Sequence, residues 1–193
     1  MDLTQGTTEE KSKRAKKMML WFAIISLVMS FAAWTSAFIV SSERPDWMRE
    51  FQLPNAFIIS TILIAISSVS FILAKRALKN DNTKLTSIWL MVTLLLGALF
   101  IFNQFAGFQE IINQGYNFTG PTSNVTMSYI YLIAMVHILL VVVGLIALLV
   151  VLYNHFKQKY TSNNMLGFEL ASTFGNLMEY LWFYLFLFFF LCG

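Results

Sequence analysis

Long apolar segments alternate with short polar ones along this chain of 193 residues. Five segments are almost free of charge over about 20 residues, the length that a helix needs to cross a hydrocarbon core of roughly 30 Å. They are residues 19–40, 55–74, 87–106, 126–153 and 170–192, and Glu179 in the last is the one Asp, Glu, Lys or Arg that they contain. The pattern predicts an all-α integral membrane bundle of five transmembrane helices. Residues 1–18 form a basic N-terminal arm in this prediction, and residues 19–193 form the membrane domain.

The composition agrees with a lipid environment, because 58% of the residues are hydrophobic and only 12% are charged. Soluble domains carry about 25% charged residues. The first apolar run, residues 19–40, is longer than the roughly 7–15 residues of a signal-peptide core. We therefore expect a retained first helix.

Basic residues indicate the orientation of the bundle. Eleven of the thirteen Lys and Arg residues precede the first span, lie between the second and third spans, or follow the fourth. Alternate connections rich in Lys and Arg are typical of the cytoplasmic side. The sequence thus predicts a cytoplasmic N-terminus and a C-terminus on the periplasmic side, and nothing in this distribution calls for nucleic acid as a partner.

Few polar side chains fall inside the predicted spans, where they are costly and usually face protein or water. Ser172, Asn176 and Glu179 follow each other at i, i+4 and i+7, so they share one stripe of the fifth helix. Gln104 lies in the third span and His137 in the fourth. We interpret these five residues as a structural intramembrane polar cluster.

His137 and Glu179 both come near the middle of their spans, so we expect their side chains to meet. In the first interpretation they form a polar clamp that holds the fourth and fifth helices in register. The alternative is a proton relay, which would make the chain a small proton-coupled membrane carrier. A relay needs further titratable groups, and carriers often show interrupted helices or paired repeats, for which the sequence gives no sign.

Histidine and cysteine are too few for a redox centre. The chain has two histidines, His137 and His155, and one cysteine, Cys192. A low-spin haem takes two axial ligands, and a copper–haem centre needs further histidines. Sequence motifs of hydrolases and phosphate-binding loops are also missing. We expect no catalytic residue, no cofactor-binding residue and no metal ligand in this chain.

Five stretches of the sequence resemble, in order, segments of subunit III of the haem-copper oxidases, the cytochrome c oxidase subunit III family. They read TSAFIVSSERPDW, LPNAFIISTILIAISS, LLLGALFIFNQ, HILLVVVGL and FELASTFGNLMEYLWFYLF. The resemblance covers residues 19–190. Longer members of the family have seven helices, and this chain is similar to the last five, a short form whose N-terminus would again lie in the cytoplasm.

The sequence departs from the family pattern at several intramembrane positions. Leu27 stands where a membrane-embedded Glu is common, and Leu140 replaces the second histidine of the motif that begins at His137. Asn176 and Glu179 stand where the family has His and Asp. Relative to the family pattern, this chain therefore retains one carboxyl in the last helix, and the resemblance leaves His137 as its remaining partner.

The resemblance implies an accessory, non-redox subunit of a bacterial haem-copper terminal oxidase, in the first place a cytochrome c oxidase of the aa3 type in the inner membrane. Such a subunit packs on subunit I in a complex that also contains subunit II, organises phospholipid and sustains turnover in aerobic respiration. Haem and copper are expected in the partner subunits. A bound phospholipid and a larger respiratory supercomplex are compatible with the family, and subunit III of a quinol oxidase is the near alternative.

Overall fold

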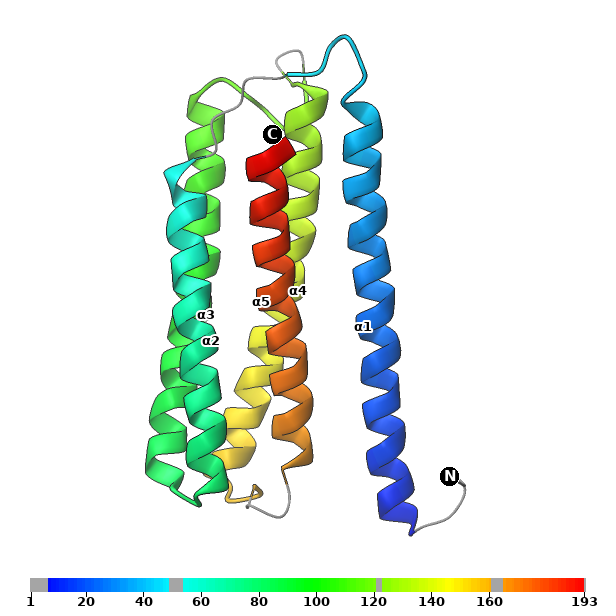
Figure 1. The fold of residues 1–193 in the computed structure, drawn as a ribbon. Helices are drawn as coiled ribbons and strands as arrows, with labels where there is room; N and C mark the ends of the chain where they lie inside the picture. The colour runs from blue at the N-terminus through cyan, green and yellow to red at the C-terminus, as the bar shows by residue number, and fades with distance from the viewer. Residues whose placement is uncertain (1–6, 49–53, 121–122, 161–164, 193) are drawn as a thin grey trace.

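The structure is a computed structural model that describes residues 7–48, 54–120, 123–160 and 165–192. Five long helices run side by side along one direction (Figure 1). They are α1 (Thr8–Ser41), α2 (Asn55–Lys79), α3 (Thr83–Asn113), α4 (Val125–Phe156) and α5 (Leu166–Cys192). Each is long and apolar enough to cross a membrane, which confirms the predicted all-α bundle of five transmembrane helices.

Every helix extends beyond its predicted apolar span. The largest extension is in α1, which begins at Thr8, inside the basic segment predicted as an arm. A capping box starts this helix: Thr7 Oγ1 accepts from the Glu10 amide at 3.3 Å, and Glu10 Oε2 accepts from the Thr7 amide at 3.0 Å. Lys13 and Glu9 add an ion pair one turn apart, at 2.7 Å. Polar residues thus continue the helix past the apolar run that a bilayer requires.

The connections leave the two ends of the bundle chemically different. The start of α1, the α2–α3 connection and the α4–α5 connection all lie at one end, the lower end in Figure 1. Most of the basic residues belong to these segments, so we call this the basic end. The α1–α2 and α3–α4 connections and the C-terminus lie at the opposite end.

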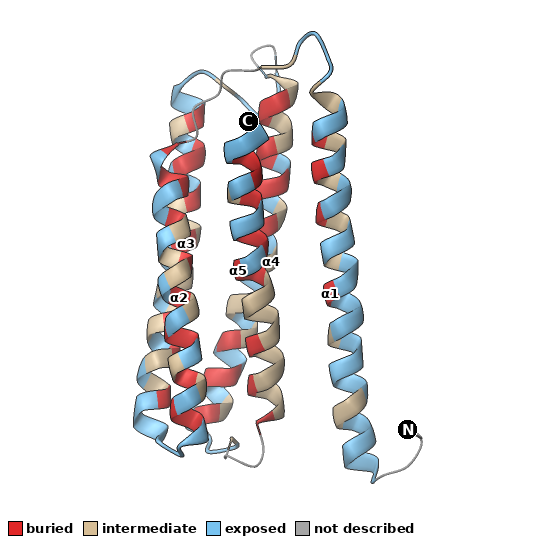
Figure 2. Cartoon of the chain, in the orientation of Figure 1, coloured by how far each residue is buried: buried red, intermediate tan, exposed pale blue. Residues whose placement is uncertain are grey.

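The core of the bundle is formed by α2, α3, α4 and α5, with α1 at one side (Figure 1). Within the described residues α1 packs on α5 and α4 alone. Its buried residues are Ile24, Phe31, Thr35 and Phe38, which form one narrow stripe. The rest of α1 is largely exposed, as Figure 2 shows, so most of its surface is available to lipid or to another protein.

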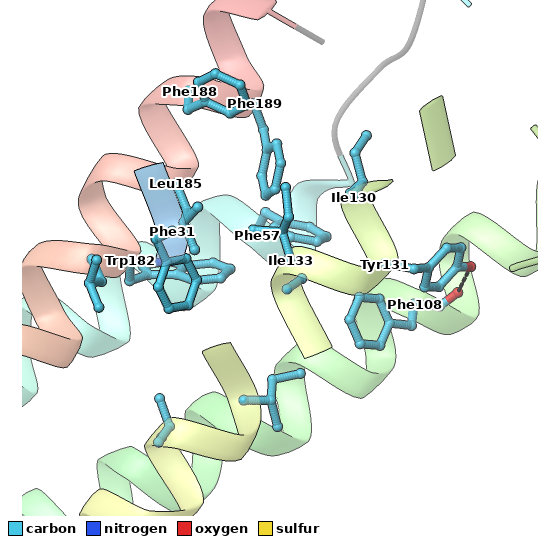
Figure 3. Close-up of a cluster of buried hydrophobic side chains, with 14 of the residues drawn as sticks. Phe31, Phe57, Phe108, Ile130, Tyr131, Ile133, Trp182, Leu185, Phe188 and Phe189 are labelled. Atoms are coloured by element: carbon cyan, nitrogen blue, oxygen red, sulfur yellow. Dashed lines mark hydrogen bonds between the residues drawn. The ribbon is translucent and has the colours of Figure 1, made fainter. Parts of the chain in front are cut away.

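Aromatic side chains fill the half of the core toward the opposite end (Figure 3). Trp182 of α5 is fully buried; it stacks on Phe57 of α2 at a centroid distance of 5.7 Å and meets the edge of Phe100 of α3 at 5.0 Å. Phe31 of α1 belongs to the same cluster. We call Phe31, Phe57, Phe100 and Trp182 the aromatic layer. Ring contacts join Phe57, Phe100 and Trp182 directly, and His137 of α4 contacts Phe31 of α1 as well as Trp182.

Hydrogen bonds between helices supplement this packing. Trp182 Nε1 donates to Thr61 Oγ1 at 3.0 Å, which ties α5 to α2. Asn103 Nδ2 donates to Ser60 Oγ at 2.8 Å and to the Ala56 carbonyl. Such bonds contribute about 0.6 kcal/mol each on average within a membrane. Their main effect is therefore to fix how the helices are rotated against one another.

Candidate functional site

His137 is the most enclosed of the predicted site residues. Its ring is fully buried and has three aromatic neighbours from the aromatic layer: Trp182 at 5.3 Å, Phe100 at 6.1 Å and Phe31 at 6.3 Å between centroids. Neither ring nitrogen has a hydrogen-bond partner among the described residues. The side chain therefore acts here mainly as a ring packed between rings.

Glu179 lies in a different environment, although it is also buried, with 7% of its surface exposed. The Ser68 side chain of α2 lies close to its carboxyl. It also lines a cavity of about 70 Å³ enclosed by α2, α3, α4 and α5, where Ser67 and Thr93 are the other polar residues of the wall. An ionised carboxylate at the centre of a bilayer costs roughly 2.5–3.5 kcal/mol on insertion scales. The neutral acid is accordingly the favoured form at this position.

The predicted contact between His137 and Glu179 is not formed. The register of α4 and α5 places Trp182 against His137. Glu179 precedes Trp182 by three residues, so it lies about 4.5 Å closer to the basic end. Its carboxyl lies close to Ser68 of α2 instead. The clamp and the two-residue relay were therefore wrong in geometry, because depth along the bundle does not determine which way a side chain points around its helix.

The other predicted residues do not gather around Glu179. Gln104 is 1% exposed, and neither atom of its amide has a hydrogen-bond partner among the described residues. Ser172 is buried and Asn176 is half-buried on α5. Among the five predicted residues, Glu179 is the one that lines the cavity. His137, Gln104 and Glu179 therefore have different surroundings, and the predicted cluster as a whole stays a prediction.

A groove runs between α1 and the bundle near the basic end. Its volume is about 390 Å³, and its walls are apolar side chains such as Leu20 of α1, Val150 of α4 and Phe174 of α5. An ion pair between Lys17 of α1 and Glu169 of α5, at 2.8 Å, lies beside it. Both side chains are about half exposed. The groove thus joins an apolar wall to a charged rim.

No group of three or more His, Cys, Asp and Glu side chains that could hold a metal ion occurs in the described part of the chain. The sequence profile of the family described as cytochrome c oxidase subunit III matches residues 3–193. The chain belongs to this family.

Relatives within the cytochrome c oxidase subunit III family serve oxidases with two different electron donors. The chain is 29% identical to "Cytochrome bo(3) ubiquinol oxidase subunit 3" of Buchnera aphidicola subsp. Baizongia pistaciae over 90% of this chain and 89% of the relative. It is 25% identical to "Cytochrome c oxidase subunit 3" of Bacillus sp. (strain PS3) over 97% and 89%. A third relative, "Cytochrome bo(3) ubiquinol oxidase subunit 3" of Pseudomonas aeruginosa, is 25% identical over 90% and 83%. As a member of the family, the chain is a multi-pass membrane protein that associates with other oxidase subunits.

Sequence reasoning missed the residues that give this subunit III its internal geometry. Trp182 was not singled out, although it separates Glu179 from His137. Ser67 and Ser68 were also missed, and they supply polar groups beside Glu179. The available signal was the run ISSVS in the second span, since small polar residues in a transmembrane helix often mark a helix interface.

Proposed function

We propose that the chain is the accessory, non-redox subunit III of a bacterial haem-copper terminal oxidase in the inner membrane, packed on subunit I in a complex with subunit II. The observation that carries this proposal is the family match over residues 3–193. The five long apolar helices support it, since they leave little of the chain outside the membrane. The subunit would then sustain turnover in aerobic respiration through its contacts with its partners.

In this proposal haem and copper are held by the partner subunits. The sequence has two histidines and one cysteine, fewer ligands than a haem pair and copper require. His137 is enclosed by three aromatic rings. His155 Nε2 lies 3.1 Å from the Thr83 carbonyl and so has a structural hydrogen bond at the basic end. Both histidines thus have structural contacts between helices of this chain.

The groove between α1 and the bundle is the place where we propose a bound phospholipid. Leu20, Val150 and Phe174 offer an apolar wall to an acyl chain. Lys17 and Trp21 lie at the basic end of the groove, and residues of these types suit the polar interface of a bilayer. The basic end is the cytoplasmic side in this arrangement.

We propose a cytochrome c oxidase of the aa3 type as the complex, with a quinol oxidase as the alternative, because relatives of both kinds cover nearly the whole chain. The donor site would lie on other subunits. A carrier built on Glu179 and His137 has less support, because the aromatic layer separates the two side chains.

The test is to purify the chain through an affinity tag in mild detergent from membranes of its native host. Haem absorbance and the masses of co-purifying chains are then measured, and the haem types together with turnover on reduced cytochrome c or on quinol identify the oxidase. We expect haem in the complex and none in the chain expressed alone. A deletion of the subunit should leave oxygen reduction intact at first and shorten its duration during turnover.

Two results would contradict the proposal. One is stoichiometric haem on the isolated chain, and the other is purification of the tagged chain without any haem-containing partner. The same tag on an unrelated multi-pass protein of that membrane is the control for non-specific association.

A further inference from the structure

The cavity beside Glu179 has the size and the polar groups that internal water needs. A cavity holds a water molecule when about 10–15 Å³ is open to its centre, and this cavity measures about 70 Å³. The Glu179 carboxyl and the hydroxyls of Ser67 and Thr93 are on its wall. Water also needs two to four polar partners, roughly the number that these side chains provide. The site is thus suited to a small water cluster.

The cavity extends from Glu179 toward the basic end. Its wall includes Phe71 and Ala171, and Ala171 lies five residues after the first residue of α5, about 8 Å along the helix. Glu179 lies thirteen residues after the first residue of α5, about 20 Å along the helix. Thr93 forms a hydrogen bond with Ser70 at 2.7 Å, so hydroxyl groups continue the polar wall in this part of the bundle.

The aromatic layer closes the cavity toward the opposite end. Phe100 belongs both to the wall of the cavity and to the rings around His137. Trp182 is fully buried one turn above Glu179 and contacts both Phe100 and His137. Rings of this kind offer no hydrogen-bond acceptor in the path of a proton. Toward the basic end, Phe71 and Phe168 pack at a centroid distance of 5.5 Å, so apolar side chains lie on both sides of the polar wall.

No second titratable group lies on the cavity wall, where Glu179 is the one ionisable residue among fifteen. The sequence of α1 has none between Lys17 and the end of the helix, and the apolar spans of α2 and α3 have none. The α4 helix contributes His137 beyond the aromatic layer, and tyrosines and His155 nearer its ends. The α5 helix contributes Glu169, Tyr180, Tyr184 and Cys192. The protonation of Glu179 is thus decided by its own surroundings.

We propose that this cavity is an internal proton site, in which water held by Glu179, Ser67 and Thr93 exchanges protons with the Glu179 carboxyl. The ligand class is water and hydronium. In the exchange step the O–H bond of the neutral acid breaks and a water O–H bond forms, which leaves a carboxylate and a hydronium ion; the reverse step restores the acid, and no electrons move. The inference does not depend on the electron donor of the oxidase or on its partners.

The test uses the purified full chain in lipid nanodiscs and infrared difference spectroscopy of the carboxyl C=O stretch. The wild type should show the band of a protonated carboxylic acid at neutral pH, and this band should shift promptly in D₂O. Glu179→Gln should lose the band. Glu169→Gln is the matched control on the same helix, and it should keep the band, because Glu169 is half exposed and paired with Lys17. If Glu179→Gln fails to fold, Glu179→Asp should move the band instead.

Two further variants separate a hydrated cavity from a dry one. Gly144→Leu adds a bulky side chain to the cavity wall, at a position where a Cβ would be in ordinary contact with its nearest neighbour, Phe174, at 3.7 Å; the band should remain and its H/D exchange should slow several-fold. His137→Leu should leave the band position unchanged, since the aromatic layer lies between the two residues. The proposal is overturned by a wild-type band that does not exchange, by unchanged exchange in folded Gly144→Leu, or by a band shift in His137→Leu.

Discussion

Replacing Trp182 by alanine should destabilise the bundle by about 3 kcal/mol, the lower end of the range for deleting a buried Trp or Phe. The lower end applies because the unfolded reference is in lipid, so the loss is one of packing with little gain from water exclusion. The structure locates that loss in three ring contacts, with Phe57 at 5.7 Å, Phe100 at 5.0 Å and His137 at 5.3 Å. Aromatic pairs contribute roughly 0.5–1.5 kcal/mol each.

The indole hydrogen bond should account for only a small part of this effect. Thr61→Val removes the acceptor of the Trp182 N–H, which lies at 3.0 Å. The expected cost is about 0.6 kcal/mol, with an upper value of about 1.7 kcal/mol, as for other hydrogen bonds between transmembrane helices. Trp182→Phe keeps a ring above Phe57 and should fall between the other two variants. The predicted order of destabilisation is therefore Trp182→Ala, then Trp182→Phe, then Thr61→Val.

Pulse proteolysis of the full chain across a denaturing-detergent titration measures these differences. Trp21→Ala is the matched control, since Trp21 lies on α1 with 58% of its surface exposed and should change the free energy of unfolding by less than about 0.5 kcal/mol. A cost of Thr61→Val equal to that of Trp182→Ala would refute the reasoning, because the hydrogen bond would then outweigh the packing. A Trp182→Ala variant as stable as Trp21→Ala would remove the aromatic layer as an organising feature.

Three other predictions concern topology and helix contacts. A reporter that is active only in the periplasm should be active when it is fused after Gly193 and inactive when it is inserted at Asn80. The reason is that the basic end is expected in the cytoplasm. The reverse activities would contradict this orientation. Lys17→Glu should lower the free energy of unfolding by about 0.2–1 kcal/mol, as for other solvent-exposed ion pairs. Adding Glu169→Lys should restore the stability in the same proteolysis assay. No recovery in the double variant would show that the pair contributes nothing. Gly107→Val should weaken the packing of α2 on α3 by about 1–3 kcal/mol through overpacking. A Cβ at this position would lie 3.2 Å from the nearest α2 side-chain carbon. A variant that unfolds at the same temperature as the wild type would contradict this prediction.

The five helices could be predicted from the sequence because a bilayer imposes a minimum apolar length, and each of the five spans meets it. The first and last residues of the helices were less predictable. The α1 helix continues to Thr8 through a capping box, whose Thr7 and Glu10 are visible as TTEE in the sequence but carry no apolar signal. Apolar length shows which part of a helix is in lipid, while capping groups decide where the helix begins.

The contacts of Glu179 could not be predicted in the same way. Counting residues places Glu179 and His137 at similar depths, yet the partner of a side chain also depends on how its helix is rotated. That rotation is set by the largest buried ring, Trp182, and by its hydrogen bond to Thr61, which come from two distant parts of the chain. The orientation of the bundle across the membrane rests on its Lys and Arg residues and stays a prediction.

The position of α1 has a consequence for the biogenesis of the chain. This helix is synthesised before the other four, but its contacts are with α4 and α5, which follow α2 and α3 in the chain. Its buried stripe and Lys17, which pairs with Glu169, therefore remain without partners in the bilayer while the three following helices are inserted. A nascent chain that stalls before α5 would expose these surfaces to the membrane. Docking of α1 therefore cannot be completed before α5 has been inserted.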